Sequence, residues 1–133
     1  MSMQGMEPVA IVTVLLLIQY FVFAILVGKA RVQRKVMAPA VTGDEVFERH
    51  FRVQQNTLEQ LLVVLPVLWL FAWYVQPLVA AALGLVFLAG RWLYCRDYIR
   101  EPAKRGRGFI IGNLAQTVLL LGALIGPVLA WLK

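Results

Sequence analysis

The chain of 133 residues is 61% hydrophobic, has a mean hydropathy of +0.76 and carries charge on only 15% of its residues. A soluble domain of this size needs more polar surface, because a small protein has a high ratio of surface to volume. The composition therefore excludes a soluble domain and indicates a small integral membrane protein.

Three stretches without charged residues set the number of helices that the sequence predicts. Residues 8–28 and 108–132 each fit one helical span of the roughly 20 residues that a bilayer core requires. The third stretch, 60–90, is too long for one span, and "WYVQP" at 73–77 is typical of a tight turn at a membrane–water interface. We therefore expect an all-α integral membrane protein, a single domain over residues 1–133 that forms a four-helix bundle. The expected helices cover approximately 7–34, 44–73, 77–99 and 105–131.

The basic residues predict the orientation of these helices. All Lys and Arg residues except Lys133 fall either between residues 29 and 52 or between residues 91 and 107. The positive-inside rule then places both basic clusters on the cytoplasmic side and both termini on the opposite side. The net charge of +6 mainly reflects this topology, so we do not expect nucleic acid as a partner.

Polar residues are expected at the membrane boundary of the second and third helices. If stretch 60–90 supplies two spans, each apolar part is shorter than the bilayer core, and polar residues must complete each span. On the second helix these residues are Arg52, Asn56 and Glu59. Together with Glu48 they follow spacings of four, four and three, which places them on one face. Ionisable groups at this depth are costly unless they are paired or solvated, which makes them candidates for a functional site.

The third helix carries a similar face, formed by Arg91, Tyr94 and Tyr98 at spacings of three and four. Its cytoplasmic end leads into the loop 99–109, which contains four basic residues. Guanidinium groups bind carboxylates bidentately, and a carboxylate such as Glu59 binds an ammonium group. The two faces therefore predict a site for a small zwitterion with more than one carboxylate, next to a lipid phase from which a hydrophobic second substrate enters.

A structural interpretation stays open for each of these residues taken alone. Arg91 would extend to the lipid headgroups, and Tyr94 and Tyr98 would belong to an interfacial aromatic belt. Glu48 and Arg52 would form an ion pair within one helix.

Three motifs resemble those of a known family, the MAPEG proteins (membrane-associated proteins in eicosanoid and glutathione metabolism). "FERHFRVQQNTLEQ" at 47–60 resembles the family's second-helix signature, and "GRWLYCRDYIREPAKRGRG" at 90–108 resembles the end of its third helix and the loop that follows. "GKARVQRKV" at 28–36 looks like its first cytoplasmic loop. The resemblance is closest to the microsomal glutathione transferase 2/3 and leukotriene-C synthase branch. It implies a homotrimer with glutathione bound at each subunit interface, near the cytoplasmic side.

The resemblance also implies roles for individual residues. Those matching the family's glutathione contacts are Arg52, Asn56 and Glu59 on the second helix, Arg91, Tyr94 and Tyr98 on the third, and Arg31 and Gln54 from a neighbouring subunit. Arg105 matches the catalytic arginine that stabilises the glutathione thiolate, with Lys104 and Arg107 as its nearest rivals for that role. No metal ligand set is expected.

The function that the resemblance implies is that of a membrane glutathione transferase. Such an enzyme joins the glutathione thiolate to lipophilic electrophiles, and peroxide reduction is a related activity of the same thiolate. The alternative is a non-catalytic lipid-binding scaffold resembling 5-lipoxygenase-activating protein, a family member that breaks the glutathione pattern at the position of Arg52. Because Arg52 is present here, the enzyme is favoured. Helices rich in alanine and valine favour a bacterial inner membrane.

Two departures from the synthase branch bear on the second substrate. Gln60 stands where that branch usually has tyrosine, and Val32 stands where it carries a second arginine after the one matching Arg31. Both departures argue against leukotriene synthesis and leave general glutathione transfer intact.

Overall fold

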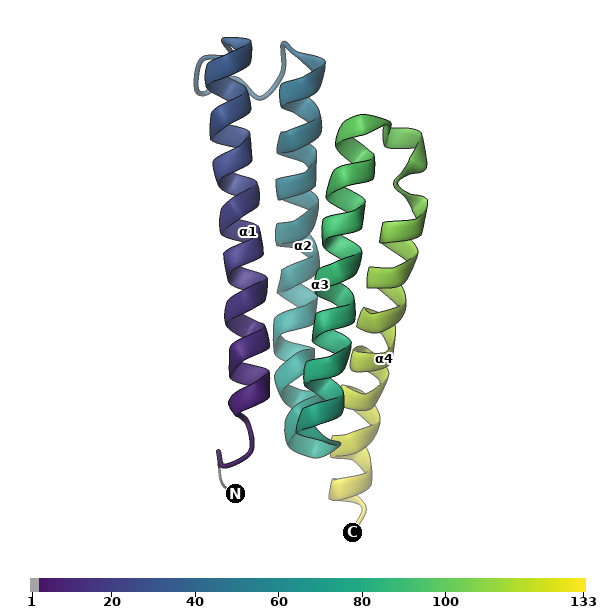
Figure 1. Ribbon diagram of the computed structural model, residues 1–133. Coiled ribbons are helices and arrows are strands. Elements are labelled where there is room, and N and C mark those ends of the chain that lie inside the picture. The colour runs from purple at the N-terminus through teal and green to yellow at the C-terminus, as the bar shows by residue number, and fades with distance from the viewer. Residues whose placement is uncertain (1–2) are drawn as a thin grey trace.

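Four long helices and one short helical turn make up the computed structural model, which describes residues 3–133 (Figure 1). The helices are α1 (Glu7–Arg34), α2 (Glu45–Tyr74), α3 (Pro77–Arg100) and α4 (Gly106–Trp131), and the 3₁₀ turn η1 (Pro102–Lys104) connects the last two. No helix end differs by more than one residue from the range expected from the sequence. The all-α four-helix bundle is therefore confirmed. Each long helix is long and apolar enough to cross a membrane, as expected for a multi-pass integral membrane protein.

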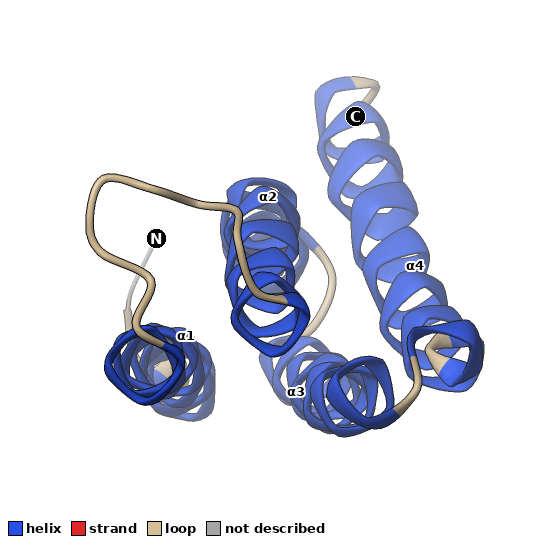
Figure 2. Cartoon of the chain, turned by 90° about the horizontal axis from the view of Figure 1, so that it is seen from above, coloured by secondary structure: helices blue, strands red, loops and turns tan. Residues whose placement is uncertain are grey.

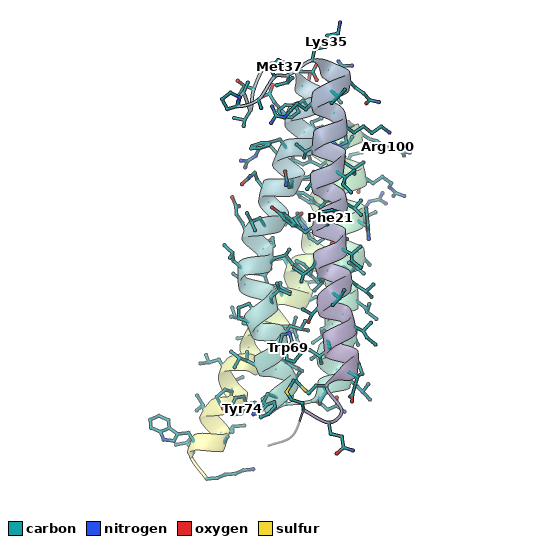
Figure 3. All side chains as sticks on the ribbon, turned by 90° about the vertical axis from the view of Figure 1, so that its left-hand side faces the viewer. Phe21, Lys35, Met37, Trp69, Tyr74 and Arg100 are labelled. Carbon is teal, nitrogen blue, oxygen red and sulfur yellow. The ribbon has the colours of Figure 1, made fainter. Side chains whose placement is uncertain are left out.

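Both connections that carry basic residues lie at one end of the bundle. Figure 1 shows the α1–α2 loop and the α3–η1–α4 connection at this end, with both termini and the α2–α3 turn at the opposite end. Figure 3 likewise places Lys35 and Arg100 toward one end and Tyr74 near the other. The two basic clusters therefore share one side of the membrane, as the charge pattern predicts, and we call this the basic end.

Short polar contacts start α2 and α3 at defined residues. Asp44 precedes α2, and its Oδ1 accepts a hydrogen bond of 3.0 Å from the Phe47 backbone N–H. This bond and the Arg34 guanidinium, whose Nε lies 2.9 Å from Oδ2, hold the pKa of Asp44 below its ordinary value. At the other end of α2, Gln76 lies in the predicted turn, and its side chain accepts from the Val79 backbone N–H at 3.0 Å. These contacts satisfy backbone donors that a helix start leaves unpaired.

Apolar side chains fill the interior of the bundle and also cover its outside. Leu16, Leu68, Phe87 and Leu119, one from each helix, are no more than 1% exposed and meet in the main core cluster. Many large apolar residues face outward, and Phe21 on α1 is 65% exposed. Apolar surface on both sides of a helix is typical of a protein whose solvent is lipid.

Glycines bring α3 and α4 into direct backbone contact near the basic end. A Cβ atom at Gly108 would lie 2.4 Å from the backbone nitrogen of Tyr94, and one at Gly90 would lie 2.7 Å from the nitrogen of Gly112. Small residues allow helices in membranes to approach this closely. Figure 2, viewed along the bundle, shows α4 beside α3 at this end and inclined to the other helices along its length. The contact fixes where α4 starts relative to α3.

We expect Gly108→Ala to destabilise the bundle by about 1–3 kcal/mol, because the added methyl group meets backbone atoms that cannot rotate away. The measurement is the unfolding midpoint in mixed detergent micelles. Gly28→Ala is the matched control, since a Cβ there meets nothing within 4 Å and alanine is the better helix former. Equal midpoints for the two variants would contradict the close packing of α3 on α4.

Candidate functional site

Helix α2 carries its polar and apolar halves without interruption, as the sequence predicts. It runs from Glu45 to Tyr74 and passes Pro66 without a break. Its polar face therefore lies at the basic end of a membrane-spanning helix, beside the end of α3 and the start of α4. This geometry brings the two predicted polar faces together.

A cleft of about 590 Å³ opens between α2, α3, η1 and the first turn of α4. Its lining combines cationic, amide, phenolic and apolar groups: Arg52, Asn56, Tyr94, Tyr98, Ala103, Arg105, Gly106 and Phe109. The volume lies in the range of small-molecule sites, which is roughly 300–1,000 Å³. Five of the residues predicted from the sequence line this one cleft, and Ala103, Gly106 and Phe109 join them.

Two tyrosines form the α3 wall of the cleft. The rings of Tyr94 and Tyr98 are stacked, with centroids 5.5 Å apart, and Tyr94 is only 5% exposed. Their hydroxyl groups belong to rings fixed by packing, so they are suited to hold a ligand in one orientation. The aromatic-belt interpretation does not describe Tyr94, which is buried within the bundle.

Arg91 lies behind this wall and does not line the cleft. Its guanidinium stacks over the Tyr94 ring at 4.2 Å from the centroid, and its Nη2 donates to Thr57 Oγ1 at 2.8 Å. With 2% of its surface exposed, Arg91 does not extend to the lipid headgroups. Its contact with the ring supports Tyr94 from inside the bundle through a cation–π interaction.

Ion pairs distinguish the three cationic residues of the α3–α4 connection. Lys104 pairs with Glu101 at 3.3 Å, and Arg107 forms two hydrogen bonds with Asp97. Arg105 instead donates from Nη1 to the Pro102 carbonyl at 2.8 Å, and residues 3–133 provide it with no carboxylate partner. Of the three, Arg105 is the one that lines the cleft and carries an unneutralised charge.

Besides Arg91, three predicted site residues lie outside the cleft of their own chain: Arg31, Gln54 and Glu59. Arg31 donates to the carbonyls of Val36 and Ala40 and stacks 4.6 Å from the centroid of the Phe47 ring, so it also organises the α1–α2 loop. Glu59 is exposed on α2.

The proposed ion pair between Glu48 and Arg52 does not form. Glu48 accepts a hydrogen bond from the Gly43 backbone N–H, and Glu45 pairs with Arg49 in its place. Arg52 therefore keeps its charge available at the cleft, and within the described chain it has no carboxylate within ion-pair distance.

Asp97 and Phe109 are two residues near the site that the sequence motifs did not single out. Asp97 is buried and pairs with Arg107, and Phe109 lines the cleft from α4. A signal for Asp97 was present, because Asp97 and Glu101 are the two acidic residues in the strongly basic segment 91–107. Phe109 had no such signal, since it follows the loop as one apolar residue among many.

The chemistry of the cleft is that of an organic anion site. Residues 3–133 contain no group of three or more His, Cys, Asp or Glu side chains placed to hold a metal ion. The single cysteine, Cys95, is buried at 5% exposure and does not line the cleft. A ligand with carboxylates would meet two unpaired guanidinium groups, an amide and two phenols there.

Comparison with known proteins shows which family and which relatives the chain resembles. The chain matches the MAPEG family over residues 9–125. It is 43% identical over 116 residues to microsomal glutathione S-transferase 2 of Homo sapiens, covering 86% of this chain and 79% of that protein. It is 33% identical over 117 residues to leukotriene C4 synthase of Cavia porcellus, covering 88% and 78%. An uncharacterized protein of Synechocystis is 51% identical over 116 residues, covering 87% and 85%.

Proposed function

This chain belongs to the MAPEG family, and we propose that it is a membrane glutathione transferase joining the glutathione thiolate to lipophilic electrophiles. The observation that carries this proposal is the unpaired guanidinium of Arg105 at the cleft, between two cations that are neutralised by carboxylates. An unpaired cation in a partly apolar cleft stabilises a thiolate more effectively than one already bound to a carboxylate.

The groups in the cleft match the groups of glutathione. This tripeptide has two carboxylates, one ammonium group and one thiol. Arg52 on α2 offers a fork of donors to a carboxylate, and Asn56, one turn further along, offers an amide to the peptide backbone. Tyr94 and Tyr98 supply hydroxyl groups on the opposite wall. Arg105 is then left for the thiol.

The reaction requires the thiolate because the thiol is a poor nucleophile. A free thiol has a pKa of about 8.5 and is mostly protonated at neutral pH. A neighbouring guanidinium favours the anion, and each unit by which it lowers the thiol pKa corresponds to about 1.4 kcal/mol. The sulfur then attacks an electrophilic carbon of the second substrate, where it displaces a leaving group or adds to an activated double bond that takes up a proton. With a hydroperoxide the sulfur attacks one oxygen, the O–O bond breaks and an alcohol leaves, and a second glutathione reduces the resulting sulfenic acid to glutathione disulfide and water. The thiol must come from the ligand, because Cys95 is buried away from the cleft.

The second substrate would arrive from the lipid. Phe109 lines the cleft and is 41% exposed, and α4 continues from it as a membrane-spanning helix. An apolar electrophile partitioned into the bilayer would therefore reach the sulfur without crossing water. Gln60 and Val32, the two departures from the synthase branch, weigh against leukotriene synthesis and leave general glutathione transfer intact.

We extend the proposal to a homotrimer in which each cleft is completed by a neighbouring subunit. Arg31 and Gln54 do not line the cleft of their own chain, and the family resemblance assigns both to glutathione from a neighbouring subunit. Arg31 and Gln54 would reach the ligand from the neighbour. The membrane would be a bacterial inner membrane with the cleft on its cytoplasmic side, which the similar Synechocystis protein and the position of the basic end support.

The test of this function is the ultraviolet absorbance of the thiolate. Glutathione is titrated into the purified protein in detergent at neutral pH, and the absorbance is compared with that of free glutathione. We expect a thiolate signal that saturates at one glutathione per site and is absent with S-methyl glutathione. A folded protein without this signal would overturn the transferase mechanism and favour the lipid-presenting scaffold.

A further inference from the structure

The segment from Asp97 to Arg107 is closed on itself by a bidentate ion pair. Arg107 donates from Nε to Asp97 Oδ2 at 2.7 Å and from Nη2 to Asp97 Oδ1 at 3.0 Å. The Asp97 side chain is 8% exposed, whereas that of Arg107 is 60% exposed. A two-point contact on a buried carboxylate fixes both the distance and the orientation of the arginine. The end of α3 and the start of α4 are therefore joined by side chains as well as by the chain.

A second anchor lies at the next residue. The backbone of Gly108 packs directly against that of Tyr94, where a Cβ would come within 2.4 Å of the Tyr94 nitrogen. Arg107 and Gly108 together fix the first turn of α4 against the cleft wall that Tyr94 forms. Arg105 stands only two residues before this anchored pair.

The conformation of Arg105 depends on the closed segment and not on a partner side chain. Its backbone N–H and its Nη1 both donate to the Pro102 carbonyl, at 3.3 and 2.8 Å. The Glu101 backbone N–H in turn donates to the Asp97 carbonyl at 2.8 Å. The two ends of this turn are held by Asp97 and Arg107. The turn therefore determines the position of the Arg105 guanidinium.

We propose that the Asp97–Arg107 pair is a positioning device that places Arg105 for thiolate stabilisation, an inference that rests on the proposed function. The pair acts in two ways. It holds the turn that carries Arg105, and it neutralises the charge of Arg107. Neither residue of the pair lines the cleft itself. Asp97 and Arg107 are therefore positioning residues, whereas Arg105 acts on the sulfur.

We expect Asp97→Asn to raise the pKa of the bound glutathione thiol by about one pH unit and to lower kcat at neutral pH about two- to fivefold, because a larger share of the bound glutathione is then protonated. The asparagine side chain accepts at one oxygen only and cannot form the two-point contact. The Kd for glutathione should change by no more than about twofold, because Arg52 and Asn56 are untouched. The readouts are the pH dependence of the thiolate absorbance and a binding titration.

Two further variants separate positioning from other roles. Arg107→Lys keeps the charge but loses the planar fork, so it should shift the thiol pKa in the same direction as Asp97→Asn. Because Arg107 is largely exposed, this variant does not disturb the core. Glu101→Gln is the matched control, since it removes a carboxylate from an exposed pair in the same segment, and it should behave as the wild type.

The outcomes separate this inference from the proposed function. A depressed thiol pKa in the wild type that rises in Asp97→Asn and Arg107→Lys, but not in Glu101→Gln, is the expected result. A depressed pKa that none of the three variants alters would overturn the positioning role alone. A wild type with no thiolate signal would overturn the proposed function and this inference together.

Discussion

Arg105→Ala should leave glutathione bound but largely protonated, with kcat lowered about 100-fold at neutral pH. Removing one hydrogen-bond donor that stabilises an oxyanion costs about 10²–10³ in kcat in other enzymes, and we expect a loss at the lower end of this range for the guanidinium that faces the thiolate. Arg105 is suited to this role because it lines the cleft and has no carboxylate partner in the described chain. The carboxylates of glutathione are expected on Arg52, so binding should change by less than about threefold.

The measurement is the thiolate absorbance at saturating glutathione, together with kcat for a soluble aromatic electrophile as a function of pH. Raising the pH should restore much of the lost rate in Arg105→Ala, because the solution then deprotonates the thiol without help from the protein. Lys104→Ala is the matched control: it removes an equal charge from the adjacent position, where the ammonium group is paired with Glu101. If Lys104→Ala lost as much thiolate as Arg105→Ala, the assignment of the catalytic role to Arg105 would be wrong.

The sequence predicted the helices because the physical signals for them are local. The absence of charge marks each span, and the polar turn at 73–77 divides the long middle stretch, where Gln76 indeed starts α3. Helical spacing also showed correctly that Arg52 and Asn56 share a face and that Tyr94 and Tyr98 share another. The cleft was therefore predictable as the meeting of two faces at the basic end.

The depth of each side chain was not predictable from spacing. Arg91 falls on the same face as Tyr94 by periodicity, yet it is buried behind the Tyr94 ring and bonded to Thr57. Periodicity gives the direction of a side chain around one helix, whereas burial depends on how closely the neighbouring helix approaches. Here the approach is set by Gly90 and Gly108, whose effect appears only when α3 and α4 are brought together.

Pairing among charges was also hidden in the sequence. The segment 91–107 offers two carboxylates to six cationic side chains, and nothing in the linear order decides which of them pair. In the folded structure Asp97 pairs with Arg107 and Glu101 pairs with Lys104. Arg105 is left without a carboxylate partner in the described chain. The two rivals for the catalytic role are thus set apart from Arg105 by their ion pairs, although all three are equally basic in sequence.

Arg52→Ala should weaken glutathione binding itself, raising Kd about 10- to 100-fold. A hydrogen bond to a charged group contributes about 1.5–3 kcal/mol, and every 1.4 kcal/mol is a factor of ten in Kd. Arg52 is the unpaired cation on the α2 side of the cleft, since the expected pair with Glu48 does not form. Calorimetric titration of glutathione into the protein in detergent measures the change directly.

The effect of Arg52→Ala should differ in kind from that of Arg105→Ala. Glutathione that does bind at high concentration should still be a thiolate, because Arg105 and its supporting turn are intact. Arg52→Lys should lie between wild type and Arg52→Ala, since an ammonium group keeps the attraction but loses the bidentate geometry. Arg100→Ala removes an exposed arginine that does not line the cleft and should bind glutathione as the wild type does. An unchanged Kd in Arg52→Ala would show that the carboxylates of glutathione are held elsewhere, and the two guanidinium groups of the cleft would then need new roles.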